Sequence, residues 1–159
     1  MPNYNPSTRA KIADMRLGLR VDKAAVSVGG ISTKSLFTVS GGHCIIFGLV
    51  GESTTGQAAG ANNAKYVSTP SGGGTATDLC TTADIASTEI GGLLHITGSF
   101  AAALVATAAG AGGGIMMTNP VVVAPGVIGF NTDADTAGSF KFSVWYSRAD
   151  DDGGYITAA

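Results

Sequence analysis

Polar and apolar residues alternate over short segments along most of the chain after residue 23, which is the pattern of half-buried β-strands. The clearest case is residues 138–147. There one predicted face carries Phe140, Phe142, Val144 and Tyr146, and the other carries Lys141, Ser143, Trp145 and Ser147. A nearly continuous apolar run over residues 43–50 predicts a central strand, in which Cys44 is expected to be a buried thiol.

Other segments with strand character are separated by Gly, Pro and Asn. They are residues 24–28, 34–40, 62–69, 93–97, 115–117, 121–124, 127–130 and 155–157. Residues 51–60 and 71–74 are predicted loops because Gly is frequent in both. A short helix is predicted only over residues 10–19, where Ile12, Met15 and Leu19 are spaced by three and four positions.

Many short strands without a long helical period predict an all-β fold. We expect an antiparallel β-sandwich of jelly-roll type with about eight strands. The domain division expected from the sequence is a basic N-terminal arm over residues 1–23 and a single sandwich domain over residues 24–159.

The net charge of −2 conceals an asymmetry: residues 1–34 have a net charge of +4, and residues 35–159 have −6. Such an asymmetry indicates a charged partner, although a solvated terminus has the same composition. Disorder is excluded because 45% of the residues are hydrophobic, and a pI near 5.5 disfavours a nucleic-acid-binding domain.

Residues 90–132 contain no Asp, Glu, Lys or Arg. A membrane span is disfavoured because Ala and Gly dominate the most apolar window and Pro120 and Pro125 follow it. Two compatible explanations are a core with an Ala/Gly loop and a surface covered by a neighbouring subunit. The second explanation predicts an oligomer interface at Ala103, Leu104, Val105, Ile115, Met116 and Met117. Residues 1–20 lack the apolar region of a signal peptide, so secretion by that route is not expected.

Motifs for catalysis are not found. The chain has no phosphate-binding G-x-x-x-x-G-K-[ST] string and no G-x-S-x-G nucleophile elbow. A catalytic triad would have to use His43 or His95, and both are interpreted as structural histidines. The same two histidines with Cys44 and Cys80 supply zinc-type ligands, but their spacing matches no zinc motif. We therefore expect no catalytic residues, no metal and no cofactor.

Two acidic stretches and one aromatic pair leave alternatives open. Asn131, Asp133 and Asp135 resemble the start of a calcium loop, but the Gly and Glu that such a loop needs are missing, so a polar hairpin is favoured. Residues 150–154 have the composition of a solvated acidic turn. Trp145, beside Tyr146, is suited either to an interface or sugar contact or to packing in the core or against another subunit.

Several stretches resemble a group of small tailed-bacteriophage proteins. They are residues 21–24 (VDKA), 36–42 (LFTVSGG), 48–55 (GLVGESTT), 77–80 (TDLC), 84–85 (DI), 92–98 (GLLHITG), 125–128 (PGVI), 145–146 (WY) and 155–159 (YITAA). The resemblance covers most of residues 21–159, except the segment 101–114, and it is greatest to head decoration (cement) proteins. Such proteins sit on the outer capsid as jelly-roll-like oligomers and clamp neighbouring capsid subunits.

This resemblance implies a non-enzymatic virion protein, made in the cytoplasm of the host bacterium and bound to the outer capsid surface. Its implied partners are the major capsid protein and further copies of itself in a dimer or trimer, with no nucleic acid and no membrane. The basic arm would then lie on an acidic capsid surface. The arm residues expected to bind there are Arg9, Lys11, Arg16, Arg20 and Lys23.

Two other functions remain open on the sequence. A head-fibre or tail-associated module that binds a receptor or carbohydrate would need an exposed aromatic platform, formed by Trp145 with Tyr146 or Tyr155. A glycan hydrolase on a jelly-roll scaffold would need His43, His95 or two carboxylates to converge in one cleft.

Overall fold

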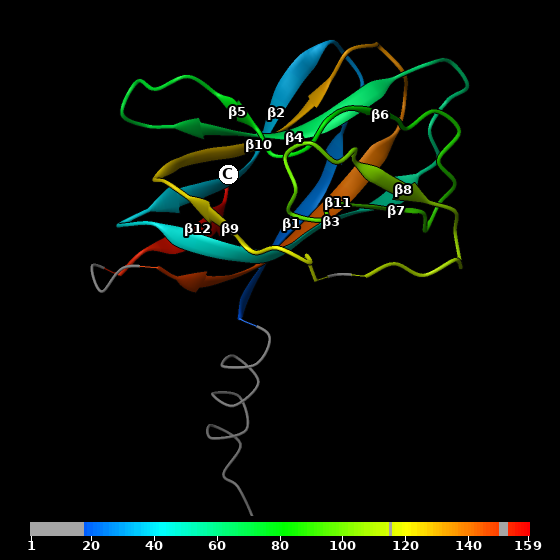
Figure 1. The fold of residues 1–159 in the computed structure, drawn as a ribbon. Coiled ribbons are helices and arrows are strands. Elements are labelled where there is room, and N and C mark those ends of the chain that lie inside the picture. Colours follow the sequence, from blue (N-terminus) through cyan, green and yellow to red (C-terminus); the bar gives the residue numbers. More distant parts are fainter. Residues whose placement is uncertain (1–17, 115, 150–152) are drawn as a thin grey trace, which may run out of the picture.

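Twelve β-strands make up the regular structure of the part of the chain that is described (Figure 1). The computed structural model describes residues 18–114, 116–149 and 153–159. The strands are β1 (Leu19–Ser27), β2 (Ser32–Ser40), β3 (Cys44–Thr55), β4 (Asn63–Pro70), β5 (Thr77–Asp78), β6 (Ala83–Asp84), β7 (Leu93–His95), β8 (Val105–Thr107), β9 (Val121–Val123), β10 (Gly126–Thr132), β11 (Ser139–Arg148) and β12 (Tyr155–Ala158).

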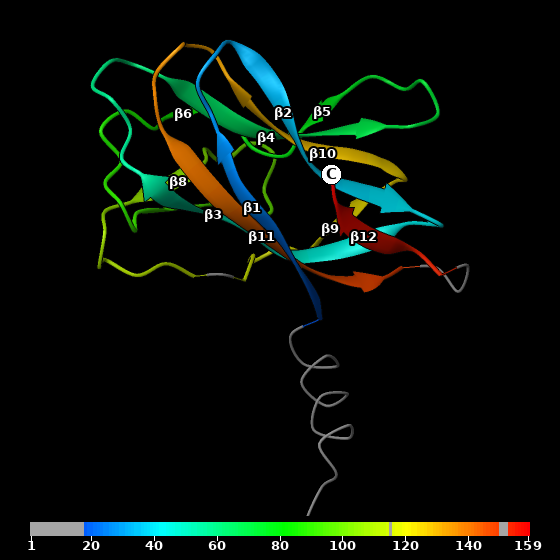
Figure 2. The same ribbon diagram turned by 180° about the vertical axis from the view of Figure 1, so that it is seen from behind.

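The strands form two sheets, and every strand pair is antiparallel. The first sheet has the order β1-β11-β3-β7-β8, with β9 also paired to β3. The second has the order β12-β2-β10-β4-β5, with β6 also paired to β4. In Figure 2, β1, β11 and β3 of the first sheet run side by side. The prediction of an all-β antiparallel sandwich is confirmed.

Aromatic rings from both sheets meet in the core between them. Tyr66 on β4 and Phe130 on β10 have ring centroids 5.1 Å apart, and Phe130 lies 5.3 Å from Phe142 on β11. Tyr66 meets Phe142 edge-on, with an angle of 85° between the ring planes. The predicted alternation of β11 is confirmed, because its four apolar residues Phe140, Phe142, Val144 and Tyr146 are all buried.

Gly51 explains one error of the sequence-based prediction. The loop predicted over residues 51–60 is wrong in its first half, because β3 continues to Thr55. A Cβ atom at position 51 would lie 2.9 Å from a ring carbon of Phe142 and 3.2 Å from the Tyr66 hydroxyl oxygen. The glycine is therefore a strand residue that leaves room for the two rings, and it does not mark a turn.

Other predicted segments shift in smaller ways. The strand predicted over residues 115–117 is not found at Met116 and Met117, and Ile115 lies outside the described residues. Residues 10–17 of the predicted helix also lie outside the described residues. Leu19 begins β1, so the sandwich starts before the predicted domain boundary between residues 23 and 24. The short strands β5, β6 and β8 were not predicted, because two or three residues are too few to show an alternating pattern.

Replacement of Phe130 by Ala tests the importance of the ring cluster. Phe130 is fully buried, so Phe130→Ala should lower the free energy of unfolding by about 3–5 kcal/mol. Chemical denaturation followed by circular dichroism measures this loss. Phe100→Ala is the matched control, because the Phe100 side chain is 52% exposed and its truncation should cost less than about 0.5 kcal/mol. Equal losses in the two variants would contradict the assignment of the core.

Candidate functional site

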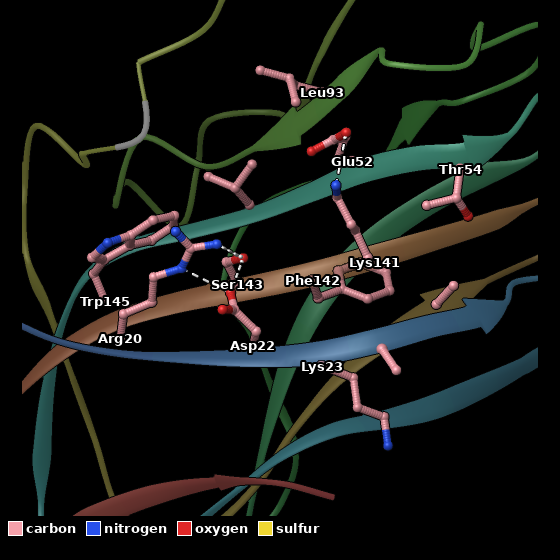
Figure 3. Close-up of a pocket in the computed structure, with 13 residues that line it drawn as sticks. Arg20, Asp22, Lys23, Glu52, Thr54, Leu93, Lys141, Phe142, Ser143 and Trp145 are labelled. Carbon is pink, nitrogen blue, oxygen red and sulfur yellow. Dashed lines mark hydrogen bonds and ion pairs between the residues drawn. The ribbon is translucent and has the colours of Figure 1, made fainter.

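The outer face of the first sheet carries a groove of about 510 Å³ (Figure 3). Side chains of β1, β11 and β3 form most of its surface, and β7 contributes Leu93. On β11 they alternate with buried residues, and on β1 with half-buried ones. Its polar and aromatic lining consists of Arg20, Asp22, Lys23, Glu52, Thr54, Lys141, Phe142, Ser143 and Trp145. The alternation predicted for β11 thus places Lys141, Ser143 and Trp145 in this groove.

Arg20 is held between a carboxylate and an aromatic ring. Its Nε donates a hydrogen bond to Oδ1 of Asp22 at 2.8 Å, and its guanidinium lies over the Trp145 ring, 5.1 Å from the centroid. The Ser143 hydroxyl donates to the same Asp22 oxygen at 2.6 Å. The hydrogen bond from Ser143 lowers the pKa of Asp22, burial opposes this effect, and Arg20 adds to the lowering.

A second ion pair crosses the neighbouring strands of the groove. Lys141 on β11 is opposite Glu52 on β3 in the sheet register, and its Nζ lies 3.0 Å from a Glu52 carboxylate oxygen. Both carboxylates of the groove therefore face a cation. Since the pKa of Asp22 is lowered, this side chain stays ionised near neutral pH and cannot act there as a general acid. The arrangement is suited to polar and aromatic contacts with a binding partner.

The structure describes only two of the five residues predicted to form a capsid-binding arm. Arg9, Lys11 and Arg16 lie outside the described residues. Arg20 and Lys23 belong to β1, so for them the prediction of an extended arm is wrong. Lys23 donates a hydrogen bond from Nζ to the main-chain oxygen of Ala159, which ties β1 to the last residue of the chain.

The predicted oligomer interface is also divided. Leu104 and Met117 are buried in the hydrophobic core of the chain itself, so neither can contact a second subunit as predicted. Ala103 and Met116 are exposed, Val105 is half-buried, and Ile115 lies outside the described residues. Absence of charge is a property that core residues share with interface residues, and for this reason the sequence did not separate the two groups.

Part of the segment without charged residues, residues 90–132, lies over the outer face of the first sheet. His95 lies on β7, with its neighbours Leu94 and Ile96 buried beneath it. A Cβ atom on Gly113 would lie 3.5 Å from Nδ1 of His95 and 3.3 Å from a methyl carbon of Leu93. The glycine-rich segment therefore passes close over this row of the outer face. Burial lowers the pKa of His95, and its Nδ1 atom is buried without a hydrogen-bond partner.

The other candidate ligands have structural surroundings. Cys44 and Cys80 are both buried, and no disulfide joins them. His43 is exposed at the start of β3. Asp133 accepts hydrogen bonds from the main-chain N and the side-chain Nδ2 of Asn63. The polar hairpin predicted here is wrong, because β10 and β11, which flank this segment, belong to different sheets. Within the described ranges, no three His, Cys, Asp or Glu side chains gather to hold a metal ion.

The three aromatic residues considered for a sugar platform do not come together. Trp145 is half-buried under Arg20 on the first sheet, and Tyr146 points from the same strand into the core. Tyr155 is exposed on β12, at the margin of the second sheet. The Arg20 guanidinium lies over the Trp145 ring, so a carbohydrate that stacks on that face would have to displace it.

No known family model, curated protein or solved structure matches the chain. Nor does the described part of the chain contain a helix with the length and apolar character needed to cross a membrane.

Substitution of Ser143 tests the electrostatics of the groove. Ser143→Ala removes the hydrogen bond that contributes most to the lowered pKa of Asp22, so this pKa should rise toward its ordinary value. A pH titration of the Asp22 side-chain carboxyl carbon by nuclear magnetic resonance measures the change. Ser147→Ala, on the same strand, is the matched control and should leave the titration of Asp22 unchanged. An unshifted Asp22 in the Ser143→Ala variant would contradict the role of this hydrogen bond.

His95 should make stability depend on pH. Its pKa is lower in the folded chain than in the unfolded chain, so the unfolded chain binds the proton more tightly. The stabilisation is fully present above the ordinary histidine pKa of about 6.5 and is lost as pH falls toward the folded pKa. Denaturation at a series of pH values should show a shallower decline for His95→Gln than for the wild type. Parallel declines would show that His95 is not responsible.

Proposed function

We propose that the chain is a non-enzymatic structural protein of a bacteriophage virion. It decorates the outside of the capsid and bridges subunits of the major capsid protein. The observation that carries the proposal is a separation of charge along the sequence, in which residues 1–34 have a net charge of +4 and residues 35–159 have −6. Residues 1–17, which include Arg9, Lys11 and Arg16, join the sandwich at Gly18, next to the main chain of Tyr146 at one end of β11.

Several acidic side chains of the sandwich lie near the start of β4 and the connection from β1 to β2. Asp84 accepts a hydrogen bond from the main-chain N of Asn62, and Asp133 accepts one from that of Asn63, where β4 begins. Asp135 lies beside Gly29 in the connection from β1 to β2. A protein that has a basic segment joined to an acidic body can be attracted to an acidic lattice through that segment.

The strand order supports the jelly-roll form of this proposal. Four strands of the first sheet follow the order β1-β11-β3-β7, and four of the second follow β2-β10-β4-β5. Consecutive long strands β1, β2, β3 and β4 therefore alternate between the sheets. We interpret this order as the two Greek keys of a jelly roll, an architecture used by viral capsid proteins, lectins and cupins.

The charge arrangement in the groove supports a binding role over catalysis. Asp22 and Glu52 are each paired with a cation, and the histidines lie at different places in the first sheet, His43 before β3 and His95 on β7. We place the protein on the outer capsid surface, with the major capsid protein and further copies of itself as partners and without nucleic acid or membrane. A decoration protein needs affinity for a lattice, which many weak contacts supply together.

Removal of residues 1–17 tests the proposal. The truncated chain keeps β1 and should remain folded, because the groove and the core are built from later residues. In reconstitution with capsids, it should lose most of its occupancy, while the full chain binds in a fixed ratio to the major capsid protein. Binding of the full chain should also weaken with added salt, since exposed charges are screened.

The matched control keeps the charge of the segment. A variant with Arg9→Lys and Arg16→Lys should occupy capsids as the wild type does, whereas Arg9→Glu with Arg16→Glu should behave like the truncation. Equal occupancy of all these variants would contradict a role of the basic segment. Absence of the full chain from purified particles would overturn the virion assignment itself.

A further inference from the structure

β1 is the one long strand at a sheet margin in the described part of the chain. It has nine residues, whereas β5, β6, β8, β9 and β12 at the other margins have two to four. Among the described strands, only β11 pairs with β1, so the main-chain groups of its second edge are not part of a strand pair, although the end of β12 lies near Lys23. An edge of this length presents unpaired main-chain groups to any strand that can pair with it.

Protection of this edge is confined to the second half of β1. The register with β11 is interrupted between Lys23 and Val26, where the strand bulges. The Lys23 ammonium is bound to the main-chain oxygen of Ala159 beside it. Bulges and lysines are common means of preventing edge-to-edge pairing. The preceding residues, Leu19 to Lys23, pair with β11 without interruption and keep a regular edge.

The regular segment is complementary to itself. Its sequence is Leu-Arg-Val-Asp-Lys, with Val21 at the centre. If two copies pair antiparallel about a two-fold axis at Val21, Arg20 of each copy stands directly opposite Asp22 of the other. Side chains in such positions have Cβ atoms about 4.5–5.5 Å apart, and opposite charges there stabilise the pair.

Both charged side chains are already held on the outer face of the sheet (Figure 3). Arg20 lies over the Trp145 ring, and Asp22 accepts the hydrogen bond from Ser143. Their side chains are nevertheless 55% and 59% exposed, so both remain accessible to a second copy. Side chains that are fixed before association lose less conformational entropy when they bind.

We infer that two copies of the chain associate through residues 19–23 of β1, in antiparallel register about Val21. The first sheet then continues across the dimer, and Arg20 and Asp22 form two reciprocal ion pairs. The interface is isologous, as expected for a two-fold dimer. It differs from the interface expected at residues 103–117, and it does not depend on binding to a capsid.

Reversal of the charges at Arg20 and Asp22, which face each other across the two-fold axis, tests this interface. Size-exclusion chromatography with light scattering should show that the full chain is a dimer over a concentration series. Arg20→Asp alone and Asp22→Arg alone each place like charges opposite each other twice, so each should weaken dimerisation by about tenfold or more. The double variant Arg20→Asp/Asp22→Arg restores opposite charges and should restore the dimer. Glu52→Lys, which changes a charge on the same face but away from the edge, is the matched control.

Cysteine cross-linking measures the register and does not depend on these charge variants. A mixture of Arg20→Cys and Asp22→Cys chains should form a disulfide between the two variants under mild oxidation, because directly opposed Cα atoms lie within disulfide range. Two Arg20→Cys chains are offset along the strand and should not cross-link. A monomeric wild type, a trimer, dimers that both single reversals leave intact, or equal cross-linking in all mixtures would overturn the proposal.

Discussion

Close contact between the two sheets at Tyr66, Phe130 and Phe142 is the constraint on which the rest of the structure depends. These rings come from β4, β10 and β11, so they join β4 to two strands that come much later in the sequence. Tyr66 is fully buried, and burial raises its pKa well above the ordinary value. Gly51 provides the space for two of the rings. A larger residue there would force the strands apart, since cores are packed to high density.

The outer face of the first sheet follows from this inner face. Once Phe142 and Val144 on β11 point inward, the pleat directs Lys141, Ser143 and Trp145 outward. The strand register then determines the partners of these residues: Lys141 is opposite Glu52, and Ser143 is opposite Asp22. The charge pairs of the groove are therefore a consequence of the register, and the core side chains hold that register in place.

The sequence predicted the parts of the fold in which one physical signal acts over many residues. The alternation of β11 and the apolar run of β3 were long enough to specify strands and their faces. Gly51 could not be assigned in this way, because a glycine in the sequence does not show whether it stands at a turn or beneath an aromatic ring. Leu104 and Met117 were placed at an interface because a segment without charge does not show which side chains face inward. The groove was missed because Arg20 and Trp145 are distant in sequence, and only the β1–β11 register brings them together.

β1 links the two proposals for this protein in one geometric argument. The strand carries the open edge, and residues 1–17 precede it directly. In an antiparallel pair centred on Val21, the two Gly18 residues are six positions apart along the strands, or about 20 Å. The two basic segments would then begin at separate points of the dimer. Such a dimer could bind two neighbouring subunits of a lattice at once, and the second contact would form at high effective concentration. A monomer with one segment has no such advantage, so edge pairing would turn a weak electrostatic contact into a bridge.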